Sequence, residues 1–123
     1  LSVCVLKVAE KAEVIAARAG GYLDRAIPQI GSMVGRLVRV EDTAARLAPD
    51  VFALALPATS ISNARLAGER IAAVIGCTAF EAGEGKTPFV VDFDLGVAQV
   101  TSAETAGRAL EEAAALAQRL KAS

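Results

Sequence analysis

Two short polar stretches in this apolar-rich chain hold residue types that could do chemistry. The first, RLAPDVFALALP (residues 46–57), predicts a β-hairpin whose bend carries Asp50 beside Pro49. The second, RVED (residues 39–42), places Arg39 three residues before Asp42. A carboxylate at an exposed bend raises the question of catalysis, and a guanidinium can fork onto a phosphate group.

Neither stretch is specific when taken alone. Asp favours the bend of a hairpin for purely local reasons, and one carboxylate cannot organise phosphoryl transfer. An exposed Arg39–Asp42 pair would ordinarily be a solvated salt bridge worth about 0 to 1 kcal/mol. The chain has no His, which excludes the usual general base, the Ser–His and Cys–His nucleophile pairs and the commonest zinc ligand.

Length and composition limit the remaining classes of function. The 123 residues fit one domain, and because the chain starts at Leu1 within an apolar stretch we expect a fragment of a longer protein. A net charge of −1 offers no broad surface for nucleic acid or anionic lipid. No apolar stretch reaches the roughly 20 residues of a membrane span, and Cys4 and Cys77 have no motif spacing, so we expect a cytoplasmic protein.

The elements that must position these stretches follow from local patterns. Residues 1–8 predict a buried strand, 10–19 a helix stopped by Gly20-Gly21, and 24–38 a second helix with Asp24 as its N-cap. Residues 43–47 and 51–57 predict the two hairpin strands, and Thr59 or Ser60 caps a third helix to residue 75. A strand within residues 88–100 and a final helix over 101–122 complete the order βααββαβα. We therefore expect an α+β sandwich, a mostly antiparallel sheet flanked by helices.

With these elements in place, the chain resembles the GGDEF domains, diguanylate cyclases that join two GTP molecules into cyclic di-GMP. The run ARLAPDVFALALPATS (residues 45–60) is similar to the family's ARYGGDEFALLLPGTS, with Asp50 and Phe52 matching. LSVCVLKVAE, LDRAIPQI and DLGVA are similar to the family's LSLLLLDIDH, GDEVLRQV and SIGVA, without gaps. The resemblance implies one domain over residues 1–123 with a nucleotidyl-cyclase-like fold.

The resemblance also implies that the metal site is lost. Active members place two aspartates at the end of the first strand to hold Mg²⁺, and here those positions are Lys7 and Ala9. A lysine puts a positive charge where a cation should bind, and an alanine offers no oxygen ligand. Of the two side chains with which the family recognises guanine, Asp24 remains and Ile15 replaces an asparagine.

The signature itself is also altered. Ala48 and Pro49 replace two glycines that allow the hairpin backbone to approach the nucleotide, and Pro49 has no N–H to donate. Val51 replaces the signature glutamate, which leaves Asp50 as the surviving carboxylate of the motif. We expect neither catalysis nor a bound metal or cofactor.

A second site of the family matches better. RVED lies five residues before APDVF, the spacing of the inhibitory RxxD motif, or I-site, that binds cyclic di-GMP. Arg70 in GERIA (residues 68–72) matches a further arginine that the family carries on the following helix. Guanidinium groups can fork onto phosphate or guanine O6 and N7, and Asp42 can accept hydrogen bonds from the guanine N–H edge. Arg36, one turn before Arg39, could add a phosphate contact.

Our leading hypothesis is a catalytically inactive GGDEF domain that receives cyclic di-GMP as a regulatory ligand through Arg39, Asp42 and Arg70. The signal would pass to a downstream protein, a neighbouring domain or a second copy of the chain. The alternative is a scaffold that dimerises or recruits a partner without nucleotide. Production of cyclic di-GMP from GTP and Mg²⁺ is the third and least favoured interpretation.

Overall fold

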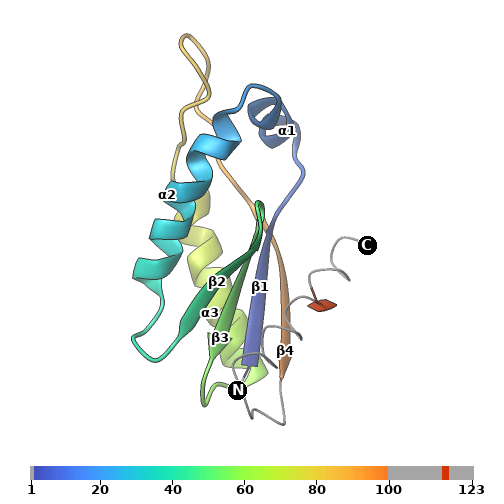
Figure 1. Cartoon of the computed structure of the whole chain (residues 1–123), viewed down its shortest axis with the longest axis vertical. Coiled ribbons are helices and arrows are strands. Elements are labelled where there is room, and N and C mark those ends of the chain that lie inside the picture. Colours follow the sequence, from blue (N-terminus) through green and yellow to red (C-terminus); the bar gives the residue numbers. More distant parts are fainter. Residues whose placement is uncertain (1, 100–114, 117–123) are drawn as a thin grey trace.

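The structure is a computed structural model that describes residues 2–99 and 115–116 (Figure 1). In chain order its elements are β1 (Ser2–Val8), α1 (Ala12–Ala19), α2 (Tyr22–Leu37), β2 (Thr43–Ala48), β3 (Val51–Leu56), α3 (Ile61–Gly76) and β4 (Phe93–Gln99). The predicted order is confirmed through β4. The helix expected over residues 101–122 lies outside the described residues, except that Ala115 and Leu116 are helical.

The four strands form one sheet in the order β2-β3-β1-β4, and every neighbouring pair is antiparallel. The central strand β1 pairs with both β3 and β4, so Lys7 lies opposite Val51 on one side and Asp94 on the other. The sheet confirms the expected α+β architecture. Its central strand also brings the end of β1 next to the tip of the β2–β3 hairpin.

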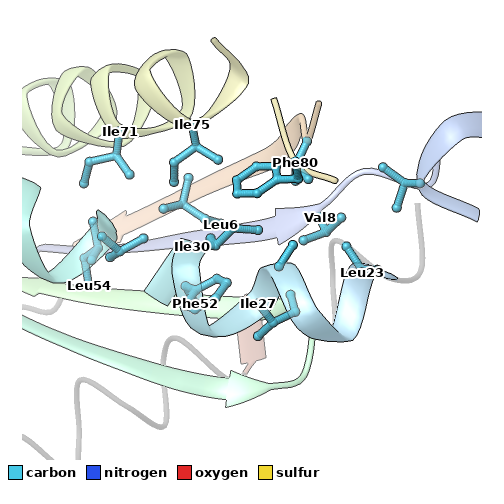
Figure 2. Packing of buried hydrophobic residues seen from close by; sticks show 14 of the residues in the cluster. Leu6, Val8, Leu23, Ile27, Ile30, Phe52, Leu54, Ile71, Ile75 and Phe80 are labelled. Carbon is cyan, nitrogen blue, oxygen red and sulfur yellow. The ribbon is translucent and has the colours of Figure 1, made fainter. Parts of the chain in front are cut away.

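β1 is buried on both faces, as its unbroken apolar sequence predicts. Cys4, Leu6 and Val8 point into the larger core, which α2 and α3 complete over one face of the sheet (Figure 2). Val3 and Val5 lie on the opposite face in a smaller cluster that includes Leu116. Each fully buried aliphatic side chain contributes about 1.5–3 kcal/mol, so β1 anchors both layers.

Burial also decides the chemistry of Cys4. Its side chain is fully enclosed, and desolvation raises the pKa of the thiol to about 12. Cys4 therefore remains a neutral thiol at physiological pH and is a structural residue of the core. Cys77 is exposed at the end of α3, and neither cysteine forms a disulfide.

The start of α2 corrects the sequence prediction. The helix begins at Tyr22, and Gly21 occupies the N-cap position with φ 82°, a left-handed conformation that glycine adopts without strain. Asp24 is therefore a residue of the first turn, where its charge favours the helix N-terminus, and the assignment of Asp24 as N-cap is wrong. Pro28 consequently lies in the second turn, on the exposed side of the helix.

The other boundaries follow local chemistry. The Ser60 side chain accepts a hydrogen bond from the Asn63 N–H at 3.2 Å, which confirms Ser60 as the cap of α3. β4 begins at Phe93, later than expected, because Phe89 instead forms an isolated bridge with Phe80 that closes the loop between them. Within residues 2–99 and 115–116, no helix combines the length and hydropathy needed to cross a membrane.

Gly68 sets how closely α3 approaches the sheet, which gives a stability prediction. A Cβ at Gly68 would lie 2.5 Å from Cys4 Sγ and 2.7 Å from Leu95 Cδ1. We expect Gly68→Ala to lower the free energy of unfolding by about 1–3 kcal/mol through overpacking. Gly35→Ala in α2, where a Cβ meets nothing within 4 Å, is the matched control and should raise it by about 0.5–1 kcal/mol. Chemical denaturation measures both, and equal effects of the two variants would contradict the packing argument.

Candidate ligand site and the altered catalytic hairpin

The RVED segment forms a tight turn between α2 and β2. Asp42 N–H donates to the Arg39 carbonyl oxygen at 3.1 Å, and Arg39 N–H donates to Asp42 Oδ2 at 2.9 Å. The Arg39 guanidinium is not paired with Asp42; it lies 3.6 Å from Glu41 and its side chain is 68% exposed. These two hydrogen bonds thus fix the turn, while the guanidinium, which pairs with Glu41, stays largely exposed to solvent.

Arg39, Asp42 and Arg70 line one pocket with about 60 Å³ of open space. Arg70 reaches it from α3, because Ile71 faces the core and places the preceding residue at the helix edge. The apolar residues of the pocket are Leu37, Val38, Leu54, Leu56, Ala67 and Ile71. Among the described residues Arg70 takes part in no ion pair. The geometry therefore joins two guanidinium-bearing residues and one carboxylate above an apolar floor.

Arg36 lies on a different part of the surface. It is in the last turn of α2 and lines a neighbouring pocket with Met33, Leu37 and Val74, rather than the pocket of Arg39. Leu37 lines both pockets and separates them. Arg36 is therefore placed to contact a ligand that extends past Leu37, but not one confined to the first pocket.

The positions where the resemblance expects metal ligands lie at the opposite end of the sheet. Lys7 is half-buried near the end of β1 between Val51 and Asp94 of the neighbouring strands, and Ala9 follows β1. An ammonium group, an alanine and a valine are a poor donor set for Mg²⁺, which requires oxygen ligands. In the described part of the chain, no three His, Cys, Asp or Glu residues gather closely enough to hold a metal ion. The residues present do not fit the family's metal pair.

The hairpin tip is a tight turn of Pro49 and Asp50 between Ala48 and Val51. Among the described residues Ala58 is the one non-glycine residue with positive φ, so this turn forms without the conformations that glycines supply. Proline and aspartate both favour such a turn, as the sequence indicated for Asp50. Asp50 also ties the tip to the sheet, because its carbonyl oxygen accepts the Val8 N–H at 2.9 Å.

A group of charged residues that the sequence analysis missed joins this tip to α1 and to the segment just before it. Arg18 of α1 pairs with Glu10 at 2.7 Å and lies 3.7 Å from the Asp50 carboxylate. The hydrogen bond to Glu10 raises the pKa of Arg18, and the charges of Glu10 and Asp50 add to this. No sequence signal marked the group, because Glu10 precedes α1 and helical spacing does not relate it to Arg18. The Asp50 carboxylate thus serves as a partner for Arg18.

The two positions that the resemblance assigned to guanine recognition, Ile15 and Asp24, lie on separate helices. Asp24 is exposed in the first turn of α2, and Ile15 is 52% exposed on α1. An exposed isoleucine offers no hydrogen bond to a base edge. The structure thus places one carboxylate and one apolar side chain at these two positions.

The chain is similar to known proteins both in sequence and in fold. Residues 20–123 match the family described as "Diguanylate cyclase, GGDEF domain". The fold is similar to diguanylate cyclase SiaD from Pseudomonas aeruginosa in complex with its activator SiaC (22% identity, TM-score 0.73, 98% of this chain and 45% of that one). It is also similar to the GGDEF domain of DgcB from Caulobacter crescentus in complex with c-di-GMP (20% identity, TM-score 0.73, 99% and 72%). The GGDEF domain of FimX from P. aeruginosa matches at 17% identity (TM-score 0.66, 96% and 75%).

The chain thus spans less than half the length of the SiaD chain and about three quarters of the two isolated domains. No curated protein sequence matches it. These structural similarities establish the fold. The activity must be inferred from the residues at the two sites.

The Arg18 network generates a prediction about the hairpin tip. Arg18→Gln should lower the free energy of unfolding by about 0.5–1 kcal/mol, because the pairs are partly exposed and screened by solvent. A double-mutant cycle of Arg18→Gln with Asp50→Asn, measured by urea denaturation at low and high salt, isolates the 3.7 Å pair. We expect a coupling that shrinks with salt. Strictly additive effects at low salt would show that Arg18 does not hold the tip.

Proposed function

Because the chain belongs to the GGDEF domain family, we propose that it is a catalytically inactive member that serves as a receptor for cyclic di-GMP. The ligand is bound by Arg39, Asp42 and Arg70. The observation that carries this proposal is the convergence of these residues, from the turn before β2 and from α3, on one pocket.

The loss of catalysis is supported by the charge and donor set at the end of β1. Joining two GTP molecules requires metal ions that neutralise triphosphate oxygens and activate a hydroxyl. Lys7 and Ala9 stand where the family's metal ligands would be, and Val51 replaces the signature carboxylate. Asp50, held near Arg18, cannot replace the missing ligands by itself.

Binding of cyclic di-GMP is supported by local charge. The chain as a whole carries a net charge of −1, so an anionic ligand must be attracted by a local group of cations. Arg39 and Arg70 supply two planar forks that match phosphate or the guanine O6 and N7 acceptors. Asp42 keeps one carboxylate oxygen beyond its bond to the Arg39 N–H, which can accept from the guanine N1 and N2 donors.

The bound ligand would act by changing a protein contact, with a neighbouring domain, a separate protein or a second copy of the chain, in the cytoplasm. No metal or cofactor is part of this role. A nucleotide-independent scaffold differs in one respect, because it would keep the protein contact without any response to cyclic di-GMP.

Isothermal titration tests the receptor role. We expect saturable heat with cyclic di-GMP at micromolar concentrations and binding at least tenfold weaker with GTP as the control ligand. Arg39→Ala and Arg70→Ala should each weaken binding by about tenfold or more, since each removes charge-assisted hydrogen bonds. Arg65→Ala, which removes an exposed arginine of α3 outside the pocket, is the matched control and should bind as wild type does.

An absence of binding by the wild-type chain, or unchanged affinity in Arg39→Ala, would contradict the receptor role. If the same wild-type chain still associates with a second copy or a partner, the scaffold interpretation gains support.

Product analysis tests the loss of catalysis. The purified chain, incubated with GTP and Mg²⁺, should form no cyclic di-GMP, because the metal ligands are missing. An active GGDEF domain run in parallel establishes that the assay detects product. Formation of cyclic di-GMP by this chain would overturn the assignment of Lys7, Ala9 and Val51 as inactivating.

A further inference from the structure

The pocket of Arg39, Asp42 and Arg70 is too small for the whole ligand of the proposed function, on which this inference rests. Its open space of about 60 Å³ is far below the roughly 300–1,000 Å³ of pockets that enclose a small-molecule ligand. Cyclic di-GMP carries two phosphates and two guanines. The pocket can therefore take a phosphate and the edge of one base, and the rest of the ligand must lie on the surface beside it.

A second hollow lies directly beside this pocket. Met33, Arg36 and Leu37 of α2 and Val74 of α3 line it, and its open space is about 130 Å³. Leu37 is shared with the first pocket, so the two hollows meet at one side chain. Leu37 and Val74 are 39% and 40% exposed, so both side chains can be reached from solvent.

The composition of this hollow suits a flat heteroaromatic ring. Met33 supplies a flexible, polarizable thioether that makes favourable contacts with aromatic rings. Leu37 and Val74 supply apolar walls. The planar guanidinium of Arg36 can stack on a purine face or donate to its acceptors.

We propose that the hollow of Met33, Arg36, Leu37 and Val74 is a second purine subsite. The ligand crosses Leu37, with one phosphate and one guanine edge at Arg39, Asp42 and Arg70 and the other base against Arg36. The subsite makes the surface selective for a dinucleotide over a mononucleotide, because a mononucleotide can fill the first pocket but cannot reach the second.

The test compares two ligands on the whole chain. Cyclic di-GMP affinity is measured by isothermal titration, and binding of guanosine 5′-monophosphate, which has one base and one phosphate, by NMR titration. Arg36→Met and Val74→Glu should each weaken cyclic di-GMP by about tenfold and leave the monophosphate affinity unchanged relative to matched controls.

The controls remove or add the same charge elsewhere on α3. Arg65→Met accounts for the loss of one positive charge, and Ile61→Glu, at a residue 41% exposed, accounts for a negative charge on an apolar surface position. Both lie outside the two hollows. Thermal denaturation confirms that each variant is folded.

The outcomes separate this inference from the proposed function. If wild type binds cyclic di-GMP and Arg39→Ala abolishes binding, but Arg36→Met and Val74→Glu match their controls, the receptor role stands and the second subsite is wrong. An equal loss for both ligands in Arg36→Met also refutes the subsite. If wild type binds no cyclic di-GMP, both proposals fail.

Discussion

The arrangement of this molecule depends on the burial of β1 on both faces and on its pairing with two neighbours. Because β1 fixes β3 through a six-pair antiparallel register, and β3 fixes β2, the hairpin cannot slip without exposing the core face. The Asp50 carbonyl bonded to Val8 N–H closes the same unit at its tip. The residues of the hairpin are held by this strand directly or through β3, and Arg36 and Arg70 lie on the helices that pack over its core face.

This constraint places the two sites at opposite ends of β2. The turn of Arg39 and Asp42 precedes Thr43, whereas Pro49 and Asp50 follow Ala48, and the intervening strand is about 17 Å long at about 3.4 Å per residue (Figure 1). Substitutions at the tip can therefore change catalysis without changing the first site. The proposed loss of catalysis, together with retained binding of cyclic di-GMP, requires only that the hairpin itself remain folded. The turn of Pro49 and Asp50, which needs no positive φ, and the Arg18–Asp50 pair both help to keep it so.

Much of the fold follows from local sequence chemistry, whereas most of the site does not. The apolar run of β1 and the Ser60 cap act within a few residues, and both predictions are confirmed. The predicted start of α2 was wrong. An aspartate near a helix start resembles a cap, but here the left-handed conformation of Gly21 sets the boundary. Arg70 joined Arg39 and Asp42 in the expected site through the family resemblance and not through local spacing. The separation of Arg36 by Leu37 and the Arg18 network depend on packing between elements, which spacing along one chain does not encode.

The central claim is that cyclic di-GMP binds beside Arg39, Asp42 and Arg70, at the end of the sheet where β2 begins, and not at the hairpin tip. NMR spectra of the backbone amides, recorded as cyclic di-GMP is added to the chain, test this most directly because they locate the ligand. The account predicts that the largest shifts fall on residues 36–42 and on α3 around Arg70, with the amides of Ala48, Asp50 and Val51 and those of α1 unchanged. Shifts concentrated at Asp50, Val51 and α1, or no shifts at saturating ligand, would contradict it.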